Sequence, residues 1–116
     1  MIITEIKDRH ELMDYLLPHN PGYVIIKFTA DWCGPCKMIK DNVYEKFNNA
    51  PDNVICCDIN IDDNSDVFSF LKSKKMVGGI PAIMVWEKGN NHFAPNDFIS
   101  GGNLNAVNDF LSKYIP

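Results

Sequence analysis

The sequence predicts an α/β fold in which one mixed β-sheet of four to five strands is flanked by four helices. Two observations support this prediction. Apolar, β-branched runs alternate with segments of helical periodicity in the order β-α-β-α-β-α-β-β-α. Helical crossovers favour parallel strands, whereas the last two strands are joined by a short turn and predict a hairpin. With 116 residues, 46% of them hydrophobic, the chain is expected to form a single domain over 1–116.

The first half of the chain supplies a short strand, a helix and a central strand. Residues 2–6 form the short strand, and Asp8 is placed to cap the helix that follows, which ends at Pro18. The apolar residues of this helix recur at helical spacing: Leu12, Met13, Leu16 and Leu17. Residues 23–29 are apolar on both faces, as is typical of an interior strand, and Lys27 is the one charge among them.

The next helix is predicted from Gly34 to about residues 48–51. Its buried stripe follows Cys36 and comprises Met38, Ile39, Val43, Tyr44 and Phe47. Residues 53–61 predict a second interior strand, and Asn64 or Ser65 then caps another helix.

The C-terminal part predicts a hairpin and a final helix. Residues 82–86 form a strand, 89–91 a turn, and 92–100 a returning strand interrupted by Pro95. An amphipathic helix follows the glycines at 101–102.

Composition excludes several classes of function. Eleven basic and fifteen acidic residues give a formal net charge of −4, and no basic cluster is longer than that at 72–75, so nucleic acid is not an expected partner. No run is long enough to span a bilayer, and residues 1–6 do not resemble a signal peptide. We therefore expect a cytoplasmic protein that does not associate with membranes. We also expect it to be a monomer.

Four cysteines, arranged as one C-x-x-C and one adjacent pair, do not form a secreted disulfide framework. Cys56 and Cys57 are neighbours on a predicted strand, where side chains alternate between faces. They are predicted to be buried free thiols.

The residues that carry chemistry are Trp-Cys-Gly-Pro-Cys-Lys at 32–37, where a central strand gives way to a helix. The unpaired N–H groups and partial positive charge of a helix N-terminus stabilise a thiolate, so Cys33 is the predicted nucleophile. Cys36 lies one turn deeper, within disulfide reach, and is the predicted resolving thiol. Pro35 suits a first helical turn, and Gly34 leaves the nucleophile accessible.

A C-x-x-C pair is also half of a zinc site. The second half is missing, because Cys56 and Cys57 cannot point to the same side of one strand and the three histidines show no ligand-like spacing. We expect no metal and no cofactor apart from the Cys33–Cys36 redox pair.

Four segments closely resemble the corresponding segments of thioredoxins: the motif at 32–37, the preceding residues 24–31, residues 58–62 and the Gly-Ile-Pro tripeptide at 79–81. The likeness extends over essentially the whole chain. The resemblance implies a thioredoxin fold and the reduction of protein disulfides by dithiol–disulfide exchange. It also implies that a flavin-dependent thioredoxin reductase, or an analogue of it, regenerates the dithiol.

By the same resemblance, Pro81 is preceded by a cis peptide bond and the backbone of Ile80 pairs with an extended substrate segment. A shallow apolar docking surface is implied around the cysteines, formed by Trp32, Gly34, Pro35, Gly79, Ile80 and the bend at Ser100, Gly101 and Gly102. Ordinary core packing of Trp32 and Ile80 is the alternative.

The sequence departs from the family beneath the active site. Thioredoxins usually place a buried aspartate six residues before the first cysteine and a lysine on the neighbouring strand, whereas here Lys27 holds the first position and Asp58 matches the second. We predict that the two lie side by side beneath Cys36. Asp58 is a candidate acceptor for the Cys36 proton, with Lys27 holding it ionised, and a purely structural ion pair is the alternative.

Two further departures are Asp41, which stands where many thioredoxins have a kinking proline and predicts a straighter helix, and a long segment at 89–101 beside the docking surface. Three other functions stay open: a glutathione-dependent reductase, a disulfide oxidase or isomerase, and a non-catalytic subunit with this fold.

Overall fold

Nine elements follow one another in the predicted order in a computed structural model that describes residues 1–116. The elements are β1 (Ile2–Ile3), α1 (Arg9–Leu16), β2 (Tyr23–Thr29), α2 (Gly34–Asn48), β3 (Val54–Asn60), α3 (Ser65–Ser73), β4 (Ala82–Glu87), β5 (Asp97–Ser100) and α4 (Leu104–Ser112). The predicted fold class is therefore confirmed. None of the four helices combines the length and the apolarity that crossing a bilayer requires.

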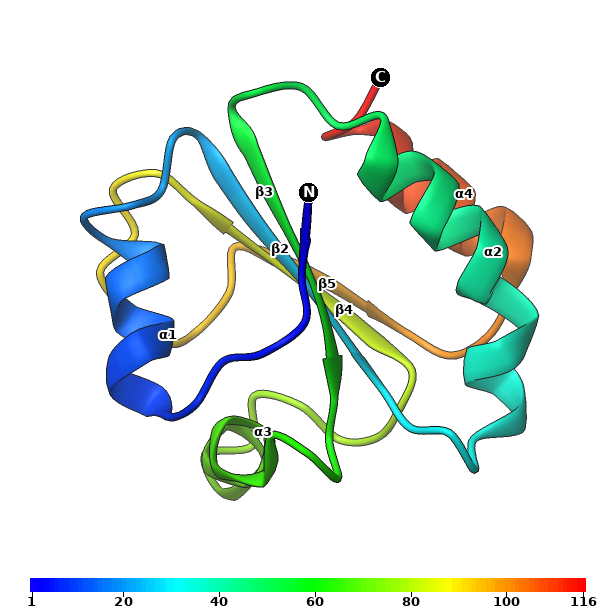
Figure 1. Cartoon of the computed structure of the whole chain (residues 1–116), viewed down its shortest axis with the longest axis horizontal. Coiled ribbons are helices and arrows are strands. Elements are labelled where there is room, and N and C mark those ends of the chain that lie inside the picture. The colour runs from blue at the N-terminus through cyan, green and yellow to red at the C-terminus, as the bar shows by residue number, and fades with distance from the viewer.

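The sheet has the strand order β1-β3-β2-β4-β5, in which β1, β3 and β2 are mutually parallel and β4 and β5 run antiparallel to their neighbours. Helices α1 and α3 cover one face, and α2 and α4 cover the other (Figure 1). Five consecutive residues of the central strand, 24–28, are buried. Because both faces of β2 are covered, its continuous apolar pattern sufficed to predict its bounds.

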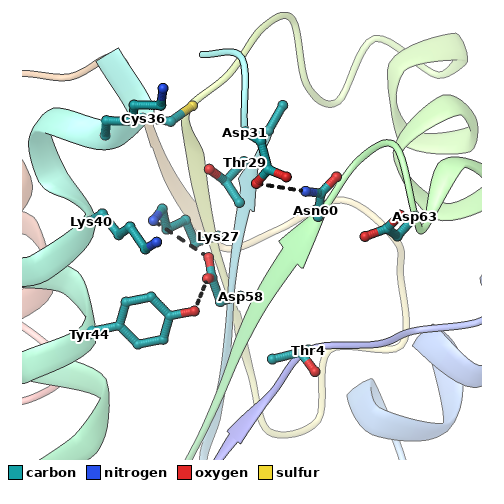
Figure 2. Close-up of a pocket in the computed structure, with 12 residues that line it drawn as sticks. Thr4, Lys27, Thr29, Asp31, Cys36, Lys40, Tyr44, Asp58, Asn60 and Asp63 are labelled. Carbon is teal, nitrogen blue, oxygen red and sulfur yellow. Dashed lines mark hydrogen bonds and ion pairs between the residues drawn. The ribbon is translucent and has the colours of Figure 1, made fainter. Parts of the chain in front are cut away.

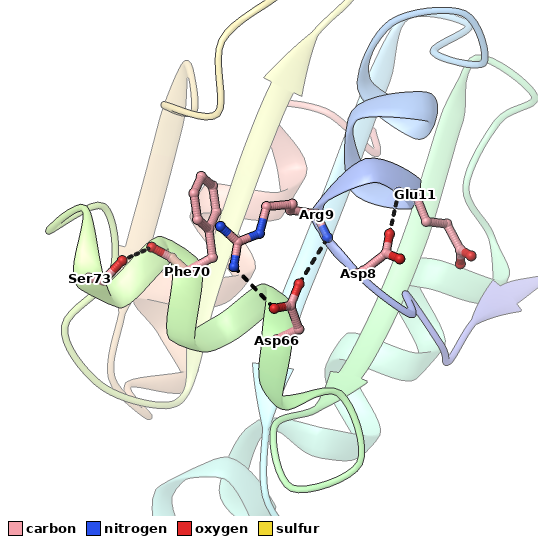
Figure 3. A network of polar contacts seen from close by, with 6 residues as sticks. All are labelled: Asp8, Arg9, Glu11, Asp66, Phe70 and Ser73. Atoms are coloured by element: carbon pink, nitrogen blue, oxygen red, sulfur yellow. Dashed lines mark hydrogen bonds and ion pairs between the residues drawn. The ribbon is translucent and has the colours of Figure 1, made fainter.

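Side chains between distant segments hold the first helix in place. Asp8 caps α1 as predicted, its carboxylate accepting from the Glu11 N–H. Arg9 contacts α3 through two 3.1 Å hydrogen bonds to the Asp66 carboxylate, one from its backbone N–H and one from its guanidinium, which also stacks over Phe70 (Figure 3). These exposed contacts align α1 with α3 rather than adding much stability.

Asn64 precedes α3 as predicted, yet its side chain does not cap that helix. It is buried, accepts from the Ile6 N–H at 3.0 Å and donates to the Asn60 carbonyl at 3.0 Å. The first of these bonds takes Ile6 away from the sheet, and β1 consequently ends at Ile3 instead of continuing to residue 6.

The returning strand predicted over 92–100 is shorter, since β5 spans only Asp97–Ser100. Polar side chains organise the residues before it into a loop. The Asn96 amide oxygen accepts from the Glu87 N–H and from the Asn90 side chain, and the Trp86 indole donates to the Phe93 carbonyl. Backbone groups in this loop therefore hydrogen-bond to side chains instead of to a neighbouring strand. Pro95 also lacks the N–H that strand pairing would require.

Helix α2 continues through Asp41 without interruption. Its buried residues are Cys36, Ile39, Val43 and Phe47, so the predicted stripe was wrong for Met38, which is exposed. Consecutive residues of a helix lie about 100° apart around its axis, so Met38 turns away when Ile39 faces the sheet.

Candidate active site

The junction between β2 and α2 presents the two cysteines at a helix N-terminus. Cys33 is the cap residue of α2, with an extended backbone, and its Sγ accepts from the Cys36 N–H at 3.2 Å. Pro35 lies in the first turn, where no N–H is required. A charge on the Cys33 sulfur would therefore face the unpaired N–H groups and the positive end of a 15-residue helix.

Cys33 and Cys36 form a disulfide, with their Cα atoms 5.3 Å apart. The structure is thus that of the oxidised form. Cys36 is 1% exposed and Cys33 is 5% exposed, so both sulfurs are largely covered, and Cys33 lies nearer to solvent. The predicted accessibility of Cys33 is slight in this oxidation state.

The loop before β4 faces Cys33. The Ile80–Pro81 peptide bond is cis, as predicted, and the Ile80 carbonyl oxygen lies 3.9 Å from the Cys33 Sγ. A disulfide sulfur carries no hydrogen, so this approach is a contact and not a hydrogen bond. Pro81 is fixed in turn, because its carbonyl accepts from the Gly101 N–H at 2.9 Å.

The bend at 101–102 packs directly against the cysteine loop. Gly101 has a φ of +100°, which favours glycine. A Cβ on Gly102 would lie 2.8 Å from the Pro35 carbonyl oxygen, closer than two such atoms can approach. The predicted bend thus includes both glycines, and Gly102 is the one that makes a close approach only glycine permits.

The backbone leading to Ile80 is unpaired. The N–H and C=O groups of Gly78 and Gly79 make no hydrogen bond within the chain, and a Cβ at either glycine would meet no atom within 4 Å. This backbone is free to pair with a second chain. Ile80 itself is half-buried against the cysteines.

Trp32 lies on the surface beside the cysteines and is 67% exposed, which excludes core packing as its role. Its indole N–H donates to the Asp62 carboxylate at 2.9 Å. Asp62 was not predicted as a site residue, since only the fold brings the end of β3 beside Trp32.

Lys27 and Asp58 are directly opposite one another on the paired strands β2 and β3, as predicted. The Lys27 Nζ lies 3.5 Å from the Asp58 Oδ1, and the two side chains are 1% and 10% exposed. Both line a hollow of about 530 Å³ that also contacts Cys36, which lies above the pair in Figure 2. The predicted position of the ion pair, beneath Cys36, is confirmed.

Tyr44 completes this cluster, reaching from α2 to donate a 2.6 Å hydrogen bond to the Asp58 Oδ2 (Figure 2). The other oxygen, Oδ1, is buried without a hydrogen-bond partner. Sequence reasoning placed Tyr44 in the apolar stripe of α2 and missed this contact. A hydroxyl on a stripe that faces a buried carboxylate is the signal that could have found it.

The pKa values of this cluster reflect burial and the Asp58 charge. Burial lowers the pKa of Lys27, and the Asp58 carboxylate opposes that effect without reversing it. The hydrogen bond to Asp58 is the largest cause that raises the pKa of Tyr44 to about 12. Tyr44 therefore stays protonated and keeps donating to the carboxylate throughout the neutral range.

Cys56 and Cys57 are buried free thiols on opposite faces of β3, as predicted. Burial raises the pKa of both, that of Cys56 to about 12. Neither ionises at neutral pH, so neither competes as a nucleophile. No group of three or more His, Cys, Asp or Glu side chains is arranged to hold a metal ion.

The sequence model of the thioredoxin family matches residues 6–113. The chain belongs to the thioredoxin family. A thioredoxin of Pseudomonas aeruginosa is 34% identical over 88 residues, or 76% of each chain. Among solved structures, Plasmodium falciparum thioredoxin has a TM-score of 0.70 and 25% identity over 95% of this chain and 84% of its own. Reduced Schistosoma mansoni thioredoxin has a TM-score of 0.73 and 22% identity over 98% of both.

Thioredoxins are protein-disulfide oxidoreductases that use a redox-active disulfide and no further cofactor. The Cys33–Cys36 disulfide occupies the first turn of the helix after the central strand, where such a group is activated by the helix N-terminus. The chain is therefore a thiol–disulfide oxidoreductase.

Proposed function

We propose that the dithiol form of this protein reduces disulfides in other proteins, with Cys33 as the nucleophile and Cys36 as the resolving thiol. The observation that carries this assignment is the asymmetry of the pair. Cys33 caps α2 and lies nearer to solvent beside the unpaired backbone, whereas Cys36 is enclosed and faces the Lys27–Asp58 hollow.

The reaction conserves electrons and sulfur bonds. The Cys33 thiolate attacks one sulfur of the substrate disulfide, whose second sulfur leaves as a thiolate and takes up a proton. The Cys36 thiolate then attacks the Cys33 sulfur, and the first substrate sulfur leaves. Two electrons pass from the dithiol to the substrate, and the Cys33–Cys36 bond forms.

The second step requires Cys36 to lose its proton in an enclosed site. Asp58 lines the same hollow, and its Oδ1 has no hydrogen-bond donor of its own. We assign Asp58 as the proton acceptor, directly or through a water molecule, with the Lys27 ammonium favouring its ionised form. A purely structural pair would leave the resolving step unchanged when Asp58 loses its charge.

The substrate lies along the unpaired backbone before Pro81, in a strand-like pairing with Ile80, and contacts the exposed face of Trp32. A flavin-dependent thioredoxin reductase regenerates the dithiol, and the protein acts as a monomer in a reducing compartment such as the cytoplasm. Two buried free thiols, Cys56 and Cys57, fit such a compartment.

Trapping of the mixed disulfide tests the assignment. Reduced Cys36→Ser, mixed with a protein disulfide such as insulin, is expected to accumulate a covalent complex through Cys33. Reduced Cys33→Ser serves as the matched variant and should accumulate little, because its remaining thiol is enclosed. Equal trapping by both variants would contradict the assigned roles.

A second assay identifies the electron donor. It compares insulin reduction by this protein when thioredoxin reductase supplies the electrons with insulin reduction when glutathione and its reductase supply them.

A further inference from the structure

We propose that the surface beside the substrate backbone holds a second subsite, which selects disulfide substrates carrying a carboxylate next to an apolar side chain. The subsite is a hollow of about 370 Å³ lined by Lys72, Lys75, Met76, Val77, Gly78 and Phe98, called the Phe98 hollow below. The proposal rests on the proposed function, because the occupant is a segment of the same substrate.

Phe98 supplies the apolar wall. It lies on β5, the edge strand, and its side chain is 61% exposed, whereas the neighbouring Ile99 packs into the core. The half-buried Met76 lines the same hollow. An apolar substrate side chain that covers this exposed ring would remove apolar surface from water, which favours binding.

Two lysines supply the charge, and hydrogen bonds hold the backbone that carries them. Helix α3 ends in a Schellman motif, in which the Met76 N–H donates to the Leu71 carbonyl and the Lys75 N–H donates to the Lys72 carbonyl. Lys75 occupies the left-handed position with a φ of +59°, where glycine is the favoured residue. A strained lysine in that place, at the rim of a hollow, indicates a use for its ammonium group.

The hollow is continuous with the backbone that the substrate uses. Val77 and Gly78 line it, and Gly79 and Ile80 follow directly, with Ile80 in contact with Cys33. Gly78 lies two residues before Ile80 along the chain, and two residues span at most about 7 Å. A substrate segment whose cysteine faces Cys33 therefore reaches the hollow within about two or three residues. The hollow lies on one side of Cys33, so the selected residues lie on one side of the substrate cysteine.

The charge of the hollow is opposite to that of the protein as a whole. The chain carries a formal net charge of −4, yet the only ionisable residues that line the hollow are Lys72 and Lys75. Asp97 adjoins Phe98, but its carboxylate accepts hydrogen bonds from Lys113 and Tyr114, which follow α4. A carboxylate on the substrate is therefore the complementary group.

Homodimeric peptide disulfides that differ only beside the cysteine test the subsite. One peptide carries Glu and Leu two and three residues before the cysteine, a second carries them after it, and two analogues have Gln for Glu. A fifth peptide has alanine at all these positions. The measurement is the single-turnover rate at which the reduced protein cleaves each disulfide.

One of the two Glu peptides is expected to react about two- to fivefold faster than its Gln analogue, as one or two exposed ion pairs allow. The preference should vanish when salt rises from about 0.02 M to about 0.5 M. Lys72→Gln and Lys75→Asn should each reduce it, while Lys74→Gln, an exposed lysine of the same helix end that does not line the hollow, should retain it. Phe98→Ser should slow both Glu and Gln peptides of the preferred side.

Equal rates for the two Glu peptides would overturn the subsite. So would a loss of preference in Lys74→Gln as large as that in Lys72→Gln and Lys75→Asn. In either case, general attraction between acidic peptides and surface lysines would explain the rates. The alanine peptide separates this failure from that of the proposed function. If the unmodified protein reduces the alanine peptide but shows no preference among the others, only the subsite is wrong. If the unmodified protein reduces no peptide, the proposed function is wrong.

Discussion

The Tyr44 hydroxyl on α2 donates a 2.6 Å hydrogen bond to one oxygen of the Asp58 carboxylate on β3. The second oxygen faces Lys27 at 3.5 Å and has no hydrogen-bond donor. One oxygen thus fixes the orientation of the carboxylate, and the other is left with free lone pairs. A free, oriented oxygen of this kind is what the proton acceptor proposed for Cys36 requires.

Removing the charge of Asp58 tests this reading. In Asp58→Asn, the step in which Cys36 resolves the mixed disulfide at Cys33 is expected to slow about tenfold or more, because a positioned base typically contributes about 10²–10⁴-fold. Rapid mixing of the reduced protein with a high concentration of a chromophoric disulfide releases one chromophoric thiol on attack by Cys33 and a second on resolution by Cys36, so the second release measures the step. Asp63→Asn is the matched control, since Asp63 lines the same hollow without contacting Lys27 or Tyr44. An unchanged rate in Asp58→Asn would leave the pair a structural role only.

Tyr44→Phe should separate orientation from charge. The variant keeps the ring and the Asp58 charge but loses the hydrogen bond, so the resolving step is expected to slow by a smaller factor than in Asp58→Asn. The free energy of unfolding at neutral pH should fall by about 1.5–3 kcal/mol, the range typical of a hydrogen bond to a charged group. Urea unfolding of both proteins measures the second effect.

The same pair of proteins gives a pH dependence with a defined sign. The pKa of Tyr44 is raised from 10.0 to about 12 in the folded protein. The stability that its proton provides is therefore complete below pH 10 and is lost as the pH rises toward 12. The stability advantage of the unmodified protein over Tyr44→Phe should shrink across that interval, and a constant advantage would contradict the assigned hydrogen bond.

The sequence predicted elements that depend on local pattern, and one contact that the family resemblance implied. The bounds of β2 followed from an unbroken apolar run. The Lys27–Asp58 pair followed from the positions that thioredoxins give to a buried aspartate and a lysine on neighbouring strands, and the observed strand register agrees with it. Contacts that join separate elements through side chains were missed. The Tyr44 hydroxyl and the Asp62 carboxylate find their partners only once α2 and the end of β3 are in place. The early end of β1 has the same cause, an asparagine 58 residues away.

Lys75→Gly is expected to raise the free energy of unfolding by about 0.5–1 kcal/mol. A φ of +59° costs a residue with a Cβ about 1–2 kcal/mol in the folded state, and glycine avoids this cost. Part of the gain is cancelled, because glycine also makes the unfolded chain more flexible and thereby stabilises the unfolded state. Lys74→Gly is the control, because Lys74 has a φ of −90° and gains nothing from glycine, so this variant should be destabilised. Thermal or urea unfolding distinguishes the two. If both changes destabilise, Lys75 is not strained.

Gly102→Ala should disturb the active site from the bend that packs against Pro35. The new Cβ would lie 2.8 Å from the Pro35 carbonyl oxygen and 3.0 Å from its Cβ, so either the bend or the first turn of α2 must move. Overpacking of this kind costs about 1–3 kcal/mol, and the shift should also change the equilibrium of the Cys33–Cys36 pair with glutathione. Gly34→Ala is the matched control for stability, because a Cβ there meets nothing within 4 Å. A Gly102→Ala protein with unaltered stability and redox equilibrium would show that the bend yields without displacing the cysteine loop.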